Sequence, residues 1–267
     1  MEKLLIIPTY NERENVTLLL QTVFELKQGF HVLIIDDGSP DGTADIVKKL
    51  FVTYPGKLFL EERRGKLGLG TAYLHGFRWA LERGYHFIFE MDCDFSHNPK
   101  DLDKLYKACK YGGADVAVGS RYVKGGKVEN WPAIRVGISK GASIYTRLIT
   151  FMPIKDPTAG FVCYRNSVLE AINFDKISFV GYAFQIEMKF AAWKLGFNIK
   201  EVPITFIDRQ FGVSKMNKGI VKEGIFGVLK LKWMSMFKNY RSRVKNYDSL
   251  FEKKPEFSAV EQNGASG

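Results

Sequence analysis

The chain has 267 residues, 46% of them apolar and 14% aromatic, which is enough to bury the core of one large domain or two small ones. This composition excludes a disordered chain and a small scaffold that depends on disulfides. The formal charge is +10, and the segment from Arg209 to Lys254, with 12 basic and 3 acidic residues, carries +9 of it. The basic character therefore belongs to one segment, which predicts a local anionic partner and no binding of nucleic acid by the body of the protein.

The first 120 residues alternate short β-branched runs with longer amphipathic stretches, a pattern typical of an α/β fold with a mostly parallel sheet and crossover helices. The predicted strands are Leu4–Ile7, Val32–Ile35, Lys57–Leu60, Phe87–Met91 and Asp115–Val118. The predicted helices are Glu12–Lys27, Thr43–Tyr54, Thr71–Arg83 and Lys100–Tyr111. Asn11 stands where a cap would accept the first free backbone N–H groups of its helix.

The pattern becomes less regular after Arg121. Further elements are predicted as a helix at Ala133–Thr150, a strand at Phe161–Tyr164, a helix at Ala183–Leu195 and a strand at Ile199–Phe206. We therefore expect one domain over residues 1–210, a basic amphipathic segment over 211–250 and a flexible polar tail over 251–267.

The cysteine pattern and the apolar runs bear on the cellular compartment. Cys93, Cys109 and Cys163 are odd in number and form no metal-binding pair, which predicts a reduced chain in the cytosol. The apolar run before Pro8 is too short for the core of a signal peptide. The stretch 220–240 is interrupted by five charged residues, so we expect no transmembrane helix.

Polar residues follow four of the predicted strands, at the edge where open parallel sheets bind ligands. These segments are Pro8-Thr9-Tyr10-Asn11-Glu12, Asp36-Asp37-Gly38-Ser39, Asp92-Cys93-Asp94 and Gly119-Ser120-Arg121. Any one of them alone would be interpreted as a capped turn. Four of them at one edge of a sheet favour a binding site.

Asp92 and Asp94 stand two residues apart, so an extended backbone directs both carboxylates to the same side. Two carboxylates this close repel each other unless a cation lies beside them. Hard oxygen ligands with few other protein groups are typical of Mg²⁺ or Mn²⁺ bound jointly with substrate phosphates. His97 is more simply interpreted as a loop residue, and we leave it out of the metal set.

The glycine-rich stretch Gly65–Gly70 has the order G-x-x-G-x-G and follows the third predicted strand. Neither the dinucleotide fingerprint nor the phosphate loop has this pattern. The stretch is therefore interpreted as a flexible turn that lets the backbone approach a ligand.

Seven strings occur in order between Leu5 and about Lys215, over about four fifths of the chain: IIPTYNE, IIDDGSPDGT, GLGTAYLHGF, MDCDFSHNP, GSRY, DPTAGF and PITFIDRQFGVSKM. Together they resemble the inverting family 2 glycosyltransferases of the polyprenyl-phosphate (dolichol-phosphate) mannosyltransferase type. The resemblance implies a GT-A fold and transfer of mannose from GDP-mannose to a polyprenyl monophosphate with inversion. It also implies Mg²⁺ or Mn²⁺ as the cofactor.

The resemblance also implies roles for individual residues. The nucleotide sugar would be bound by Pro8, Tyr10, Glu12, Ile35, Asp36, Asp37, Asp92, Cys93, Asp94, Arg121, Arg209 and Lys215. The catalytic set would be Asp92, Asp94, Arg121 and Arg209, and the metal ligands Asp94 and Ser96. The acceptor phosphate would be held by Arg121, Arg135 and Asp156, although Asp156 is equally well explained as the cap of a proline turn.

The basic C-terminal segment has two interpretations. Seven apolar residues fall close to one helical face: Ile225, Val228, Leu229, Trp233, Met236, Phe237 and Tyr240. This face fits either a helix lying in a membrane interface or one packed against the catalytic domain. The resemblance favours peripheral contact with the cytoplasmic face of a membrane, because the acceptor is a lipid. Some relatives rely on a separate membrane-anchoring subunit, which is therefore a possible partner.

Two other functions compete with this interpretation. A family 2 transferase could instead use UDP-glucose or UDP-N-acetylglucosamine, with a lipid phosphate or a glycan as acceptor. A non-catalytic protein could bind nucleic acid or anionic lipid through its basic segment, but the intact Asp92/Asp94 pair argues against that.

Overall fold

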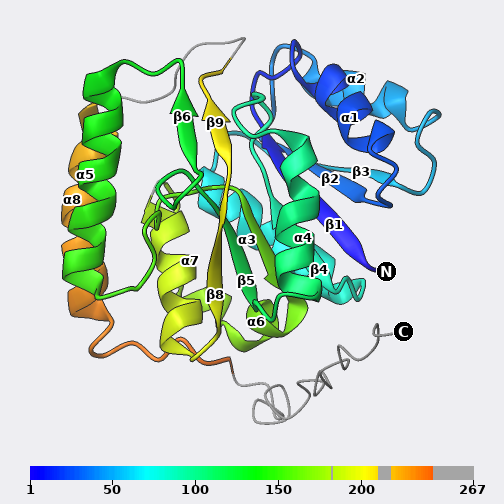
Figure 1. The fold of residues 1–267 in the computed structure, drawn as a ribbon. Coiled ribbons are helices and arrows are strands. Elements are labelled where there is room, and N and C mark those ends of the chain that lie inside the picture. Colours follow the sequence, from blue (N-terminus) through cyan, green and yellow to red (C-terminus); the bar gives the residue numbers. More distant parts are fainter. Residues whose placement is uncertain (182, 210–217, 243–267) are drawn as a thin grey trace, which may run out of the picture.

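The structure is a computed structural model that describes residues 1–181, 183–209 and 218–242. A seven-stranded sheet with the order β3-β2-β1-β4-β7-β5-β8 forms its centre, with helices on both faces (Figure 1). Its strands are β1 (Lys3–Thr9), β2 (His31–Asp36), β3 (Leu58–Glu62), β4 (Phe87–Glu90), β5 (Val116–Ser120), β7 (Val162–Arg165) and β8 (Ile199–Pro203). A smaller sheet pairs β6 (Lys127–Glu129) with β9 (Thr205–Ile207).

The helices form a layer on each face of the large sheet. They are α1 (Val16–Glu25), α2 (Thr43–Leu50), α3 (Leu69–Glu82), α4 (Leu102–Lys110), α5 (Ala133–Thr150), α6 (Asn166–Ala171), α7 (Ala183–Lys194) and α8 (Lys218–Met234), with 3₁₀ turns at Pro99–Asp101 and Phe174–Lys176. Alternate β1 residues point to opposite sides, so Leu4 packs with α3 and α7 while Leu5 packs with α1 and α4. The strands are thus apolar on both faces, as buried parallel strands are.

Most neighbouring strands are parallel, as predicted, and β7 is the antiparallel exception between β4 and β5. β1 pairs with β2 on one side and with β4 on the other. The order of strands in the sheet therefore reverses between β1 and β4, because β2 and β3 are added on one side of β1 and the later strands on the other. Ligands of open α/β sheets bind at such a reversal point, outside the carboxyl ends of the strands. The residues after β1, β2 and β4 meet at this edge.

The predicted start of the first helix was wrong. The helix begins at Val16 rather than Glu12, and Asn11 does not cap it but adopts a left-handed backbone with φ +57°. The physical reason is tertiary: the Asn11 N–H donates to Ser39 Oγ and the Glu12 N–H to Thr43 Oγ1, each at 3.0 Å. The segment before the helix is therefore held against the β2–α2 loop.

The predicted strand Ile199–Phe206 is two strands that belong to different sheets. The chain turns at Ile204, whose N–H donates to Ser120 O while its carbonyl accepts from Lys127 N. Beyond it, Ile207 N donates to Ser96 O, in the loop that follows β4. β9 thereby delivers Asp208 and Arg209 to the carboxyl edge of the sheet.

α8 lies beside α5 and also contacts α7 (Figure 1). The predicted single apolar face divides in two, because Val228 and Tyr240 are buried against the body whereas Trp233 and Phe237 are 63% and 79% exposed. Packing against the catalytic domain thus accounts for Val228 and Tyr240, and the membrane interpretation stays a prediction for the exposed residues. In the portion of the chain that the structure describes, no helix has the length and apolarity needed to cross a membrane. The predicted tail over 251–267 lies outside the described residues.

Candidate active site

The loop after β4 places Asp94 next to an arginine from the far end of the chain. Asp94 Oδ1 accepts a hydrogen bond from Ser96 N at 3.1 Å, and Asp94 Oδ2 lies 3.3 Å from Arg209 Nη2. β9 brings Arg209 here because its backbone is hydrogen-bonded to the same loop. The structure thus joins two of the predicted catalytic residues.

The donor set around Asp94 fits a hard divalent cation. Ser96 Oγ is buried and has no hydrogen-bond partner among the described residues, although it lies in the same loop as the Asp94 carboxylate. No cluster of three or more His, Cys, Asp or Glu side chains suited to a metal occurs in the described part of the chain. Asp94 and Ser96 together offer two hard oxygen ligands, of the kind that Mg²⁺ and Mn²⁺ take alongside phosphate oxygens.

His97 is packed between aromatic rings. Its imidazole stacks on Phe161 at 5.0 Å between ring centroids and meets Phe206 edge-on at 5.3 Å. Burial lowers the pKa of His97 to about 4, so the ring is neutral near pH 7. These aromatic contacts hold the ring, whose Nδ1 is buried with no hydrogen-bond partner among the described residues.

Asp36 organises the loop after β2. Its Oδ1 accepts from Thr9 Oγ1 at 2.8 Å and Ser39 Oγ at 2.6 Å, and its Oδ2 accepts from Ser39 N at 2.8 Å. The carboxylate is buried and its bonds join the ends of β1 and β2. Asp36 therefore stabilises the loops that form the predicted nucleotide site.

Asp37 pairs with an arginine that the sequence analysis missed. Arg63 Nε donates to Asp37 Oδ1 at 2.7 Å, and its Nη1 donates to Thr71 Oγ1 at 2.8 Å. Both charged side chains are largely buried. Arg63 follows β3, so extending the search for polar residues to the end of that strand would have found it.

The remaining predicted nucleotide residues line the same edge or lie just behind it. Pro8 is paired with Ile35 in the β1–β2 register, and the Lys66 ammonium lies 5.0 Å from the centre of the Tyr10 ring. Glu12 Oε2 accepts from Asn15 Nδ2 at 2.8 Å. The side chains of Ile35 and Cys93 are buried in the two cores, and Ile35 is paired with both Pro8 and Glu61 within the sheet. Lys215 lies outside the described residues.

In the glycine-rich stretch, Gly65 and Gly68 have positive φ, and Gly70 is required by packing. Gly70 N donates to Val180 O at 2.8 Å, and a Cβ on Gly70 would lie only 2.7 Å from the Phe184 ring. The absence of a side chain lets α3 approach the segment before α7. Gly70 therefore makes a close approach to the protein's own chain, and an approach of the stretch to a ligand stays a prediction.

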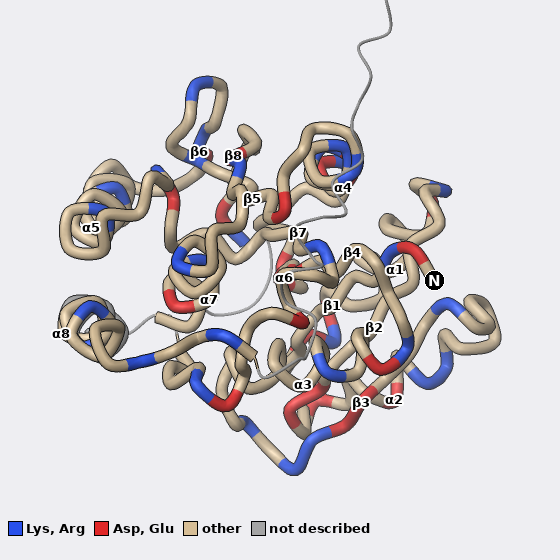
Figure 2. Tube along the Cα trace, turned by 90° about the horizontal axis from the view of Figure 1, so that it is seen from below, with Lys and Arg blue, Asp and Glu red and all other residues tan. Residues whose placement is uncertain are grey.

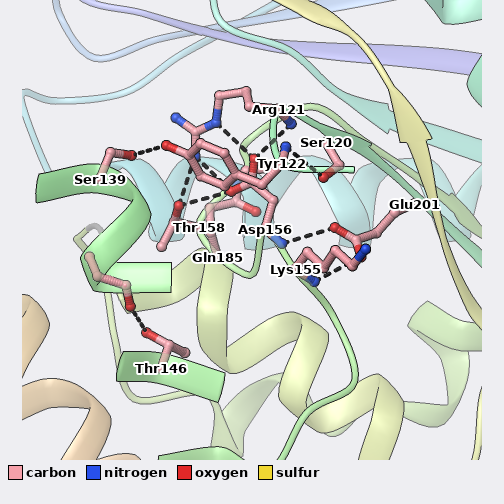
Figure 3. Close-up of polar contacts among 12 residues, drawn as sticks. Ser120, Arg121, Tyr122, Ser139, Thr146, Lys155, Asp156, Thr158, Gln185 and Glu201 are labelled. Carbon is pink, nitrogen blue, oxygen red and sulfur yellow. Dashed lines mark hydrogen bonds and ion pairs between the residues drawn. The ribbon is translucent and has the colours of Figure 1, made fainter. Parts of the chain in front are cut away.

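Arg121 and Asp156 form a buried, bidentate ion pair (Figure 3). Arg121 Nε and Nη2 donate to the two Asp156 oxygens at 2.8 and 2.7 Å, and the Arg121 backbone N donates at 3.0 Å. Burial alone would raise the pKa of Asp156, but the hydrogen bonds and charge of Arg121 outweigh it and hold the pKa below its ordinary value. Asp156 thus orients Arg121, and the proline-turn explanation alone does not account for it.

The loop 155–160 that carries Asp156 is fixed from two further sides. Glu201 accepts from Lys155 N at 2.7 Å and from Asp156 N at 2.9 Å, and Thr158 Oγ1 accepts from Arg121 Nη2 at 2.8 Å (Figure 3). Beneath the loop, Lys189 Nζ donates to Ala159 O at 2.6 Å. These hydrogen bonds therefore hold the loop in place beside the candidate site.

Arg135 reaches the same region from α5. Its Nη1 lies 3.0 and 3.1 Å from the two Asp208 oxygens, and its guanidinium stacks 4.0 Å from the Trp131 ring. Trp131 in turn packs edge-on against Phe206, at 5.2 Å between centroids. The three predicted phosphate-binding arginines, Arg121, Arg135 and Arg209, consequently gather around β9.

A buried polar chain under the site was not predicted. Gln185 Nε2 donates to Glu90 Oε2 at 3.0 Å, and Lys189 Nζ donates to Gln185 Oε1 at 3.0 Å. Burial raises the pKa of Glu90 to about 8 and lowers that of Lys189 to about 8. In the sequence, the run FQIEMKF shows no amphipathic pattern that separates these polar residues from the core.

Two kinds of comparison bear on these residues. Residues 4–172 match the model of the family described as Glycosyl transferase family 2. The polyprenol monophosphomannose synthase of Mycolicibacterium smegmatis is 47% identical over 225 residues, which cover 84% of each chain. The undecaprenyl-phosphate mannosyltransferase of Micrococcus luteus is 43% identical over 244 residues, which cover 91% of this chain and 99% of that protein.

Solved structures are similar at much lower identity. A mannosyltransferase from Pyrobaculum calidifontis in complex with GDP-Man and Mn²⁺ gives a TM-score of 0.55 at 16% identity, covering 88% of this chain and 64% of that one. Glucosyl-3-phosphoglycerate synthase from Mycobacterium tuberculosis in complex with UDP gives 0.62 at 12% identity, covering 87% and 80%. These likenesses concern the fold alone, and they confirm the predicted GT-A type.

Proposed function

The chain belongs to glycosyltransferase family 2, and on this premise we propose that it transfers mannose from GDP-mannose to a polyprenyl (dolichyl-type) monophosphate. The observation that carries the proposal is the identity of 43–47% to two proteins named for this type of reaction, over 84–99% of their lengths. The proposed product is a polyprenyl β-mannosyl phosphate.

The donor side of the reaction follows from Asp94, Ser96 and Arg209. Cleavage of the sugar–phosphate bond builds negative charge on the leaving diphosphate. Mg²⁺ or Mn²⁺, held by Asp94 and Ser96, would supply a Lewis acid at that diphosphate. Arg209, 3.3 Å from the Asp94 carboxylate, is placed to donate to the same phosphates and to stabilise the charge where it develops.

The acceptor side requires no strong general base. A phosphate monoester has a second pKa of about 6 and is largely ionised at neutral pH, so its oxygen can attack directly. Arg135 and Arg121 border the region where this phosphate would lie, and Asp156 keeps the Arg121 guanidinium in position. Attack from the face opposite the leaving group would convert an α-linked donor into a β-linked product.

Exposed apolar side chains on α5 and α8, and on the residues that directly follow these helices, support peripheral contact with the membrane that contains the acceptor. They are Ile134, Ile138, Ile144, Leu148, Phe151, Phe226, Leu229, Trp233, Met236 and Phe237. Basic residues accompany them on both helices (Figure 2), and the Lys232 ammonium lies 4.6 Å from the centre of the Phe151 ring. Apolar and cationic groups together fit the interface of an anionic, cytoplasmic leaflet. A separate anchoring protein would be unnecessary if the purified chain binds vesicles alone.

The proposed activity is tested by incubating the protein with GDP-mannose, Mg²⁺ and a polyprenyl phosphate. Mass analysis should show one hexose added to the lipid, and NMR of the product should show the β-anomer. UDP-glucose and UDP-N-acetylglucosamine serve as competing donors, and GDP should raise the melting temperature more than UDP does in Mn²⁺. Transfer from a UDP-sugar in preference to GDP-mannose would contradict the proposed donor, and an α-anomer would contradict inversion.

A further inference from the structure

Gly160, at the end of the loop 155–160, faces a small space between two polar atoms. A methyl group on its Cα would have two atoms of the described residues within 4 Å beyond its chain neighbours, Gln185 Nε2 at 3.9 Å and Asp92 Oδ2 at 4.0 Å. Gly160 is not among the glycines with positive φ, so its backbone does not demand glycine. The missing side chain leaves room beside an amide nitrogen and a carboxylate oxygen.

The orientation of the Gln185 amide is fixed by its two neighbours. Lys189 can only donate, so it identifies the atom it contacts as Oε1, and the other amide atom, Nε2, donates to Glu90. Nε2 carries two hydrogens, and in the part of the chain that the structure describes one of them is used by Glu90. All three side chains are buried, so turning the amide would break both bonds in a medium where unpaired polar groups are costly.

Gln185 and Asp92 offer complementary hydrogen-bonding groups. A hydroxyl both accepts and donates, so one hydroxyl in this space can accept from Gln185 Nε2 and donate to Asp92 Oδ2. Asp92 stands two residues before Asp94, on the loop proposed to hold the donor diphosphate. The sugar of a nucleotide sugar is bonded directly to that diphosphate, so its hydroxyls fall within reach of the loop.

We propose that Gln185 and Asp92, both beside the position that a Gly160 side chain would occupy, form a subsite that binds one hydroxyl of the donor hexose. The inference rests on the proposed function and names residues that would recognise the sugar rather than the nucleotide. A site built to pair with a hydroxyl discriminates strongly against a ligand that lacks it, because its own polar groups are then left unpaired.

The variant Gly160→Ala tests this subsite without disturbing the buried chain. Its new methyl group would meet Gln185 and Asp92 at ordinary van der Waals distances, so the fold and melting temperature should be retained. Gly137→Ala, on α5 with no atom within 4 Å of the added methyl, is the matched control. Calorimetric titration in Mn²⁺ should show GDP-mannose bound at least tenfold more weakly by Gly160→Ala, GDP bound within twofold of wild type, and neither changed by Gly137→Ala.

Two results would overturn the subsite. Unchanged affinity of Gly160→Ala for GDP-mannose would mean that the space holds water only, and equal weakening of GDP and GDP-mannose would mean that the substitution distorts the diphosphate site. Gly160→Ser, with a hydroxyl in the same place, should reproduce the selective loss. If the wild type binds UDP-glucose in place of GDP-mannose, the proposed donor is wrong, and the same comparison of UDP-glucose with UDP still decides the subsite.

Discussion

Replacing Asp156 by Asn removes the negative charge from the buried ion pair with Arg121 and changes little in shape. The Asp156 side chain is fully buried and that of Arg121 is 7% exposed, so solvent screens the pair weakly. Three Arg121 hydrogen bonds end on this carboxylate, whereas the Nη2 bond to Thr158 would keep its acceptor unaltered. The variant therefore removes the carboxylate that is paired with a buried guanidinium.

Breaking a buried pair from one side costs about 3–5 kcal/mol of unfolding free energy. In a domain of this size each kcal/mol lowers the melting temperature by about 2–4 °C, so we expect Asp156→Asn to melt on the order of 10 °C below wild type at pH 7. The double variant Arg121→Met/Asp156→Asn should melt at a higher temperature than Asp156→Asn alone, because it also removes the buried positive charge of Arg121.

The dependence on pH follows from the lowered pKa of Asp156. A group whose pKa is depressed by folding stabilises the protein above its unfolded pKa of about 3.9, and that stabilisation is lost as the pH falls through the lower folded pKa. The difference between wild type and Asp156→Asn should therefore be constant from pH 7 to 5 and shrink below about pH 4. Thermal melts within 2 °C of each other at pH 7 would refute the reasoning.

Three further outcomes are expected. Asp94→Ala should lower transfer by more than a hundredfold at saturating Mg²⁺ or Mn²⁺ while circular dichroism stays unchanged, and activity within tenfold of wild type would exclude Asp94 as a metal ligand. Arg209→Lys should lower kcat far more than Arg78→Lys, a control in a surface ion pair, because lysine cannot bind phosphate bidentately. Equally small effects of the two substitutions would show that Arg209 does not bind a phosphate. Trp233→Ser/Phe237→Ser should weaken co-sedimentation with anionic liposomes at low salt. High salt should weaken it further, because it screens the attraction of about 1 kcal/mol that each basic residue contributes near an anionic surface. Binding equal to wild type would exclude Trp233 and Phe237 from the membrane contact.

Local patterns in the sequence predicted the elements that position the donor site. The helix Ala133–Thr150 was predicted at its observed bounds, and the polar segments after β1, β2 and β4 do meet at one edge. Both results rest on rules of short range: hydrophobic periodicity gives the elements, and parallel pairing brings the carboxyl ends of strands together.

Interactions between distant segments could not be predicted in this way. The partner of Arg121 is 35 residues away, and that of Asp37 is 26 residues away, just before the glycine-rich stretch that was interpreted as a turn. Gln185 and Lys189 lie in a helix buried on all sides, where periodicity gives no sign of which polar residues face the site. Such pairs depend on the register and packing of elements, which the pattern of a single segment does not contain.

β9 explains why the donor and acceptor sides of the site depend on each other. Its Ile207 N–H donates to Ser96 O in the loop after β4, and its Phe206 ring packs against His97 and Trp131. Immediately after it, Asp208 holds Arg135 and Arg209 reaches Asp94. A displacement of this three-residue strand would therefore move the proposed metal ligand and the proposed acceptor arginine together. One short element would thus set the positions of the donor and acceptor phosphates relative to each other.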